Sequence, residues 1–252
     1  MSTCILDLAP FLPSDEKLKR SGLPDKALHL KGRAAGLAGQ LNPVTAATLR
    51  RHMEVINSYY SNLIEGNRTK PHEIRQAQHG DFSADPVARD LQQESLAHIQ
   101  VQSLLAERKL DAEKVFSSDT LRWLHRAFYQ RLPEHQREVH DEATGEAETV
   151  EPGQYRRRTV SVGHHIAPAA EDLPTLVDSF FDIYKPDRHP GTDKIIAVMA
   201  AHHRLLWIHP FLDGNGRVAR LWTDEALKTA GLESVGVWCL SRGLARGSDH
   251  YK

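Results

Sequence analysis

The chain has 252 residues, of which 40% are hydrophobic and 26% charged, proportions typical of a globular protein rather than a disordered one. Its formal net charge is -1, which argues against a large surface of one sign and therefore against a nucleic-acid partner. Only Cys4 and Cys239 are present, so the sequence predicts no disulfide framework and fits a reducing, cytoplasmic location.

The first residues contain an apolar run at 4–12, but Asp7 interrupts it and no basic segment precedes it. This is not the pattern of a signal peptide. No apolar stretch approaches the length that crosses a bilayer, so no membrane partner is expected.

Residues 1–44 are rich in Pro, Gly and Lys and end in a turn signal at Asn42-Pro43. We expect mostly irregular structure there. From Thr45 onward, apolar residues recur at alternating steps of four and three, which predicts one helix ending at Gly66. The members of this stripe are Leu49, Met53, Ile56, Tyr60 and Leu63.

Further helices are predicted at residues 71–79 and 86–109, where apolar positions again share one face. Ser118 and Asp119 are residue types that cap helices, and another helix is expected to follow them. Residues 131–153 are acidic and show no periodicity, which predicts a loop.

Residues 155–166 differ from everything before them, because β-branched side chains stand beside Gly163. They predict a short β-hairpin. Helices are expected again at 173–184, 192–208 and about 216–229. The predicted fold is therefore all-α, a helical core with one small β-hairpin and an N-terminal helical appendage.

A glycine-rich segment, HPFLDGNGRVAR, fills residues 209–220 between the last two predicted helices. Gly214, Asn215 and Gly216 allow backbone N–H groups to converge on an anion without obstruction by side chains. The positive end of the following helix lies at the same place. This segment predicts a phosphate-binding loop.

The charged residues of the same segment extend this prediction. Arg217 and Arg220 are three apart on one helix face and can hold separate phosphates. Asp213 supplies a hard oxygen for Mg²⁺ shared with the phosphates. His209 suits a general base because an unperturbed imidazole titrates near neutrality. Together they predict attack by a hydroxyl at a nucleotide phosphorus.

The segment HPFLDGNGRVAR resembles the motif of the Fic family, HPFxDGNGRxxR, with every fixed position filled. The resemblance implies a protein adenylyltransferase that uses ATP and Mg²⁺, with a target protein as its partner. It implies that His209 deprotonates a Ser, Thr or Tyr hydroxyl and that Asp213 holds Mg²⁺. The glycine-rich loop would hold the α- and β-phosphates, Arg217 the β-phosphate and Arg220 the γ-phosphate.

The resemblance also carries a division of the chain. It covers about residues 115–252, so we expect a Fic catalytic core there and an N-terminal helical region at 1–114. Family members have a hairpin flap that binds the backbone of the target, and the predicted hairpin stands at the flap's place in the sequence. The implied flap residues are Val160, Ser161, Val162, Gly163 and His164.

A second motif lies in the N-terminal region. SNLIEGN, residues 61–67, resembles the family's inhibitory motif S/T-x-x-x-E-G/N, at the end of a helix spanning about 45–66. Ser61 and Glu65, just before Gly66, are four apart and share a helix face. The resemblance implies that Glu65 pairs with Arg220 and withdraws it from the γ-phosphate. Taken alone, Glu65 is a solvated glutamate that opposes the helix dipole.

Other functions stay open at the level of sequence. A kinase-like member of the family typically has Lys where this chain has Gly216. A bifunctional or AMP-removing enzyme would use Glu65 to orient water. A non-catalytic, nucleotide-responsive interaction module would have no reason to keep His209. A Rossmann reading of GxGxxA at 214–219 lacks the strand that should precede it.

The remaining polar clusters receive structural interpretations. Adjacent His202 and His203 lie on different helix faces and lack a zinc-binding spacing, so packing roles are expected. His164 and His165 are expected at the surface of the flap tip, and residues 156–158, all Arg, on a solvated face. Residue 247 is Gly where relatives commonly have an Asn near the adenine. The base preference, the target, a homodimer and continuation past Lys252 are left open.

Overall fold

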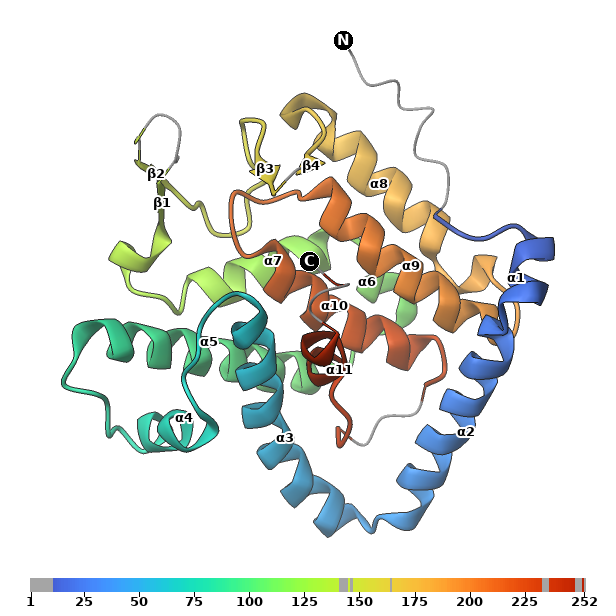
Figure 1. Cartoon of the computed structure of the whole chain (residues 1–252), viewed down its shortest axis with the longest axis horizontal. Helices are drawn as coiled ribbons and strands as arrows, with labels where there is room; N and C mark the ends of the chain where they lie inside the picture. The colour runs from blue at the N-terminus through green and yellow to red at the C-terminus, as the bar shows by residue number, and fades with distance from the viewer. Residues whose placement is uncertain are drawn as a thin grey trace. The chain divides into compact units, whose positions relative to one another are not determined.

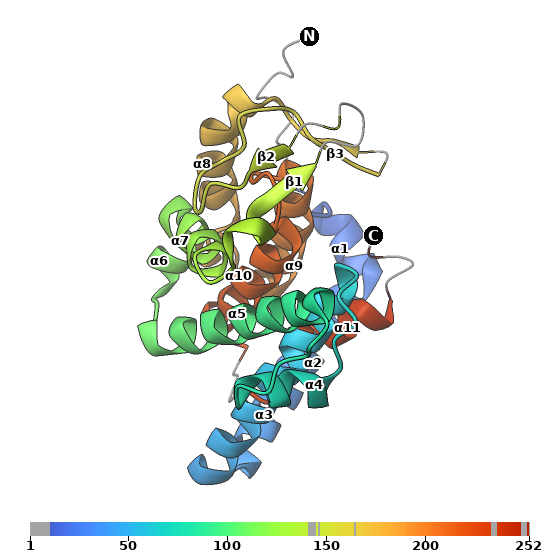
Figure 2. The ribbon, with the colours of Figure 1, turned by 90° about the vertical axis from the view of Figure 1, so that its left-hand side faces the viewer.

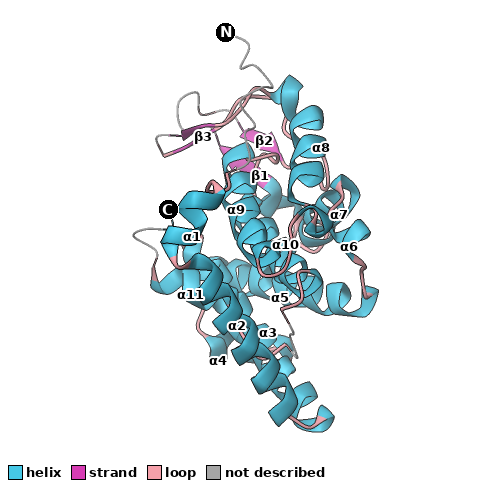
Figure 3. Cartoon of the chain, turned by 90° about the vertical axis from the view of Figure 1, so that its right-hand side faces the viewer, coloured by secondary structure: helices cyan, strands magenta, loops and turns pink. Residues whose placement is uncertain are grey.

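The computed structural model describes residues 11–140, 145, 147–163, 165–232, 236–247 and 251. These residues form helices and two short antiparallel hairpins (Figure 1). Figure 3 shows the strands confined to the hairpins. The all-α class is therefore confirmed, with one more hairpin than predicted.

The chain divides into two compact units. The first comprises Met1–Gln40, Leu110–Trp123 and Gln154–Ser234, and the second Leu41–Lys109, Leu124–Gly153 and Val235–Lys252. Helix α7 (Ser118–Tyr129) begins in the first unit and ends in the second.

The first unit contains the glycine-rich segment. Its helices are α1 (Asp15–Ser21), α2 (Leu23–Gln40), α6 (Ala112–Val115), α8 (Leu173–Tyr184), α9 (Asp193–Ile208) and α10 (Asn215–Thr229). Short 3-10 turns, η3 (Ala170–Asp172) and η4 (Pro186–Arg188), precede and follow α8. The hairpin pairs β3 (Ser161–Val162) with β4 (His165–Ile166).

The core of the first unit is built around Trp222 of α10, which is fully buried. Its ring packs against Phe116 and Phe180, with centroids 5.3 Å and 5.5 Å away. Its indole N–H donates a 2.9 Å hydrogen bond to the carbonyl of Val115. Burying so large an aromatic side chain contributes a large part of the packing energy. It also holds α10 in place, and with α10 the loop that precedes it.

The second unit contains the SNLIEGN segment. Its helices are α3 (Pro43–Ile64), α4 (Pro71–Gln78), α5 (Pro86–Arg108) and α11 (Leu240–Arg246). Val55, Ile74 and Ile99, one from each of α3, α4 and α5, form an apolar cluster. Because one side chain comes from each helix, the cluster joins all three, and Figure 2 shows α4 beside α5.

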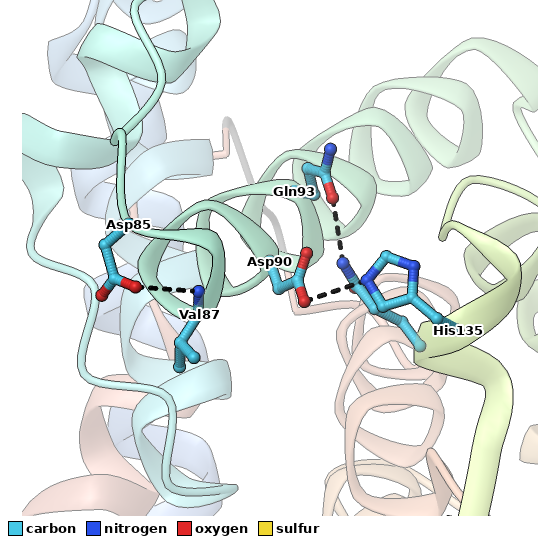
Figure 4. A network of polar contacts seen from close by, with 6 residues as sticks. Asp85, Val87, Asp90, Gln93 and His135 are labelled. Carbon is cyan, nitrogen blue, oxygen red and sulfur yellow. Dashed lines mark hydrogen bonds and ion pairs between the residues drawn. The ribbon is translucent and has the colours of Figure 1, made fainter.

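A second hairpin in this unit pairs β1 (Glu138–His140) with β2 (Ala147–Thr149). Figure 4 shows how the preceding turn η2 (Glu134–Arg137) is attached to α5. His135 Nε2 lies 2.9 Å from a carboxylate oxygen of Asp90, and the Gln136 amide donates to Gln93 at 2.9 Å. Because η2 leads directly into β1, these contacts fix the start of the hairpin.

Most predicted helices are confirmed to within two residues, namely α3, α4, α5, α7, α8, α9 and α10. The cap of α7 is one residue earlier than expected, because Ser117 Oγ accepts from the N–H of Thr120 at 3.2 Å. Cys4 lies outside the described residues.

The prediction of irregular structure for residues 1–44 was wrong, because α1 and α2 form there. Only Ala27 is buried along the 18 residues of α2. A helix that buries so little has a weak apolar stripe, and Gly32 and Gly36 weaken the pattern further.

The loop predicted at 131–153 was also wrong, because η2, β1 and β2 form there. Each strand has only three residues, too few to display an alternating pattern. In the described part of the chain, no helix is both long and apolar enough to span a membrane.

Candidate active site

His209 ends α9 in the left-handed conformation, with φ 50° and ψ 61°. Its N–H donates to the Leu205 carbonyl at 3.0 Å. Left-handed backbone is uncommon for residues other than Gly, and a following proline restricts the backbone further. Since Pro210 follows, this conformation must be imposed by tertiary contacts.

The ring of His209 is oriented by the Leu206 carbonyl, which lies 3.3 Å from Nδ1. A carbonyl only accepts, so Nδ1 carries the proton of the neutral ring and Nε2 keeps its lone pair. Burial lowers the pKa of His209, and the charges of Arg156 and His165 lower it further. The Leu206 carbonyl and Asp213 act in the opposite direction without reversing the shift. The imidazole is therefore neutral at pH 7, as a general base must be.

The loop after His209 is braced by one side chain. Asn215 Oδ1 accepts from the N–H of Phe211 at 2.9 Å, and Asn215 Nδ2 donates to the Phe211 carbonyl at 2.8 Å. Gly214 precedes α10 with φ 77°, a conformation that favours glycine. The first N–H groups of a helix have no carbonyl ahead of them to bind. The start of α10 therefore has the properties of an anion site.

The two arginines of the segment are both buried in α10. Arg220 is 1% exposed, and the Arg217 side chain 8%. Arg217 Nη2 donates to Asp213 Oδ2 at 3.1 Å. The predicted metal ligand and a predicted phosphate ligand are thus brought together as an ion pair.

A buried polar link joins α9 to α10. His202 Nδ1 lies 2.7 Å from Thr223 Oγ1, which also lies 2.7 Å from the Ala219 carbonyl. Thr223 has one proton and gives it to the carbonyl, so His202 Nδ1 donates to the hydroxyl. Burial lowers the pKa of His202 to about 3. His203 lies on another face and stacks on Phe11. The packing role expected of His202 is supported, and the two rings do face different ways.

The β3–β4 hairpin holds the implied flap residues Ser161, Val162 and Gly163, which are all exposed. Val160 lies just before β3 and accepts from the N–H of Ala167 at 3.0 Å. His164 lies outside the described residues.

Two expectations for this region were wrong. His165 Nε2 lies 2.7 Å from the Trp207 carbonyl, so this ring ties the hairpin to α9 instead of standing free at its tip. Arg156 is 4% exposed and does not belong to a solvated face. Sequence reasoning missed this residue because nothing within three consecutive arginines distinguishes the buried one.

The SNLIEGN segment forms the end of α3 in the second unit. The N–H of Gly66 donates to Leu63 and that of Asn67 to Asn62, at 3.1 Å and 3.0 Å. This is a Schellman motif, with Gly66 as its left-handed residue at φ 96°. Ser61 is fully buried, whereas Glu65 is exposed. The two residues thus share a helix but not an environment.

Polar contacts to α5 hold this helix end in place. Ser58 Oγ donates to the Ser95 carbonyl at 2.8 Å. The Asn67 amide donates to Glu94 Oε2 and to the Leu91 carbonyl, at 2.7 Å and 2.9 Å. Because these contacts flank Glu65 on both sides in sequence, the backbone that carries its carboxylate is well anchored.

The acidic side chain nearest the anion loop in sequence is Asp213, whose side chain is 48% exposed. An accessible carboxylate fits Mg²⁺, which binds one or two carboxylates together with water and phosphate oxygens. Across the described residues, no three His, Cys, Asp or Glu side chains are grouped to hold a metal ion.

The sequence profile of the Fic/DOC family matches residues 115–227. Over 98 residues the chain is 36% identical to a protein adenylyltransferase Fic of Drosophila willistoni, and 38% identical to the protein of that name in Nematostella vectensis. These alignments cover 39% of this chain but only 20% and 23% of the two relatives. The chain thus aligns with a small part of each.

The fold is similar to that of solved structures. A crystal structure of a Fic family protein from Desulfovibrio desulfuricans G20 has a TM-score of 0.67 and 22% sequence identity. The superposition covers 90% of this chain and 64% of that one. The profile match includes the loop, His209 and both arginines described above. On these grounds residues 115–227 contain a domain that matches the Fic/DOC family.

Proposed function

We propose that this chain is a protein adenylyltransferase that moves AMP from ATP to a Ser, Thr or Tyr hydroxyl of a target protein. The observation that carries the proposal is the neutral His209 ring at the mouth of the Gly214 loop. Its Nδ1 is engaged by Leu206, which leaves the basic nitrogen for a substrate. The names of the two relatives support the same chemistry.

In this reaction, His209 Nε2 accepts the proton of the target hydroxyl while the hydroxyl oxygen attacks the α-phosphorus of ATP. The bond between the α-phosphorus and the bridging oxygen to the β-phosphorus breaks, and pyrophosphate leaves with that oxygen. The proton on His209 then passes to solvent. Positioned proton transfer of this kind contributes on the order of 10²- to 10⁴-fold.

The three phosphates of ATP would be held by the loop and the arginines. The first N–H groups of α10 would bind the α- and β-phosphates, and Arg217 and Arg220 the β- and γ-phosphates. Mg²⁺, when bound through Asp213, would neutralise charge on these phosphates.

The Asp213–Arg217 ion pair has a part in this proposal. The two side chains lie 3.1 Å apart and neutralise each other. A nucleotide with its cation would exchange this pair for two new ones, Asp213 with the cation and Arg217 with a phosphate. Nucleotide and cation would therefore bind together more readily than either alone.

We further propose that the chain inhibits itself through Glu65, acting from the N-terminal region 1–114 on a catalytic core at 115–252. Glu65 would pair with Arg220 and exclude the γ-phosphate, so that ATP binds in an unproductive pose. Support comes from the SNLIEGN motif and from the anchored helix end that presents an exposed carboxylate.

The target would bind at the hairpin. Val162 is 49% exposed and Ile166 70%, and an exposed strand edge can pair with an extended segment of another protein. The proposed contacts are the backbone of residues 160–163, with side-chain packing on Val162.

The test is self-modification with ATP labelled at the α- or the γ-phosphorus, followed by intact-mass analysis. The variants are wild type, Glu65→Gly, Glu65→Gly/His209→Ala, and Glu107→Gly as a control that removes another exposed glutamate near a helix end. We expect α-label and an AMP mass only in Glu65→Gly, because positioning of the α-phosphorus governs the rate.

Transfer of the γ-label would replace the proposal with a kinase. Equal labelling of wild type and Glu65→Gly would refute the inhibitory role. Labelling that persists in the double variant would remove His209 from the mechanism.

A further inference from the structure

Arg156 is a buried arginine whose hydrogen bonds go to backbone carbonyls. Nε donates to His209 at 2.8 Å, and Nη2 donates to Pro168 at 2.6 Å and to Ile208 at 3.4 Å. Nη1 donates to Arg158 at 2.8 Å. Burial lowers the pKa of Arg156 to about 10, so the guanidinium stays charged at neutral pH. A buried charge is costly unless it is well satisfied, and here four carbonyls satisfy it.

Two of these carbonyls belong to the end of α9. The last carbonyls of a helix have no partner within the helix, and a cation near them is favourable. The backbone N–H of Arg156 donates to Pro210 at 3.0 Å. One residue therefore binds three successive carbonyls, from Ile208 through Pro210, at the point where the catalytic segment begins.

This arrangement determines the torsions of His209. The carbonyls of Ile208 and His209 are separated by the φ and ψ of His209, and one planar guanidinium binds both. Fixing both carbonyls fixes the two torsions, and with them the direction in which the imidazole leaves the backbone. Left-handed backbone is unfavourable for a non-glycine residue, so it persists only where surrounding contacts enforce it.

The same guanidinium holds the hairpin. Arg158 precedes β3 and Pro168 follows β4, so their carbonyls lie on the two legs of the β3–β4 hairpin. Arg156 therefore binds both strands of the hairpin at the end where they join the rest of the chain. The direction of the base and the root of the hairpin thus depend on one side chain.

We infer that Arg156 is a positioning residue that locks the backbone of His209 and the root of the β3–β4 hairpin into one geometry. The functional consequence rests on the proposed function: the general base and the target-binding hairpin keep a fixed position relative to each other. Lysine cannot replace it, because one ammonium lacks the planar fork that spreads donors over separate acceptors.

The first test is spectroscopic and needs no catalytic activity. Imidazole NMR signals of His209, identified by their loss in His209→Ala, are recorded in wild type, Arg156→Lys and Arg157→Lys. Arg157 is the exposed neighbour and a matched control. We expect shifted His209 signals only in Arg156→Lys. Unmoved signals in a folded Arg156→Lys, or equal shifts in both variants, would overturn the inference.

The second test measures kinetics in the Glu65→Gly background. Displacing a catalytic group by about 1 Å costs on the order of 10²-fold, so Arg156→Lys should lower kcat by that order. The KM for ATP should change little, because the phosphate loop is braced by Asn215. A rise in the KM for ATP with kcat unchanged would contradict the inference. No transfer by any variant would refute the proposed function and leave the spectroscopic result standing.

A third test covers the case in which Arg156→Lys folds but is too unstable for the NMR and kinetic measurements. Glycine adopts the left-handed conformation without cost, so His209→Gly should recover part of the thermal stability that Arg156→Lys removes. Melting temperatures of the two single variants and the double variant measure this coupling. Strict additivity would show that Arg156 does not enforce the backbone of His209.

Discussion

The two motifs of this protein lie at the C-terminal ends of two helices, α9 and α3, and the backbone turns differently at each end. Helix α9 ends at His209, a left-handed non-glycine residue that precedes proline. Helix α3 ends at Glu65 and turns through Gly66, a left-handed glycine whose Cβ position is open space. The first end requires a buried arginine to hold it, whereas the second closes with its own backbone hydrogen bonds.

The difference shows where this fold accepts strain. At α9 the strained residue itself carries the proposed base, so the site needs both the side chain and the unusual backbone. At α3 the carboxylate proposed to be inhibitory stands one residue before the turn, so glycine can make the turn without loss. Strain is therefore present where side chain and backbone geometry are required of the same residue.

The largest expected effect comes from removing the imidazole. In the Glu65→Gly background, His209→Ala should lower AMP transfer by on the order of 10²- to 10⁴-fold. His209→Gly should be equally inactive but melt higher than His209→Ala, because alanine keeps the left-handed strain. Transfer of the radiolabel measures the activity of these variants, and thermal melts measure their stability. Equal melting temperatures for His209→Ala and His209→Gly would show that the backbone at the end of α9 is not strained.

The next effect concerns the ion pair beside the strained end. Arg217→Ala should weaken ATP binding roughly 10- to 100-fold, since a charge-assisted hydrogen bond contributes about 1.5–3 kcal/mol. Asp213→Asn should lose the Mg²⁺ dependence of that affinity. Calorimetry measures both, with the exposed Arg33→Ala as the control. Unchanged ATP affinity in both variants would show that Asp213 and Arg217 do not take part in nucleotide binding.

The pH dependence of AMP transfer should come from His209, at the end of α9. Burial lowers the pKa of His209 below its ordinary value of 6.5, so the neutral base predominates throughout pH 6.5 to 8. The midpoint of the acid limb of the transfer rate of Glu65→Gly should therefore lie below pH 6.5, and at lower pH the rate should fall about tenfold per pH unit as the imidazole becomes protonated.

Stability should follow the same sign. Below pH 6.5 the unfolded chain binds the proton of His209 more readily than the folded chain, so folding stability falls as the pH falls. Urea unfolding at a series of pH values measures this slope. His209→Ala should reduce it, and the contribution of His202, whose pKa burial lowers to about 3, should remain. An acid limb of the transfer rate with its midpoint above pH 6.5 would show that the pKa of His209 is not lowered.

The smallest effect tests the relaxed end. Gly66→Ala should destabilise the protein by about 1–2 kcal/mol, because alanine resists the left-handed conformation. Gly32→Ala is the matched control, also facing open space but inside α2, and should stabilise by about 0.5–1 kcal/mol. Denaturant unfolding measures both. Changes of the same sign would show that Gly66 has no special conformational role.

The long helices could be predicted from the sequence, and so could the chemistry that is proposed for the loop. The apolar stripes of α3, α5 and α8 repeat over several turns, so local spacing is enough to locate them. HPFLDGNGRVAR likewise contains its glycines, carboxylate, imidazole and arginines within one short segment, and the family match followed from it. Information that lies close together in the chain can be read without coordinates.

Features that depend on contacts between distant residues became visible only in the folded structure. Arg156 and His209 are 53 residues apart, so neither the buried guanidinium nor the left-handed backbone it holds has a local signal. Helix α2 buries a single residue, and β1 and β2 are three residues each, so neither imposes a strong pattern. Pairing, burial and strain arise only when separate segments meet, because their energies belong to contacts and not to positions in the sequence.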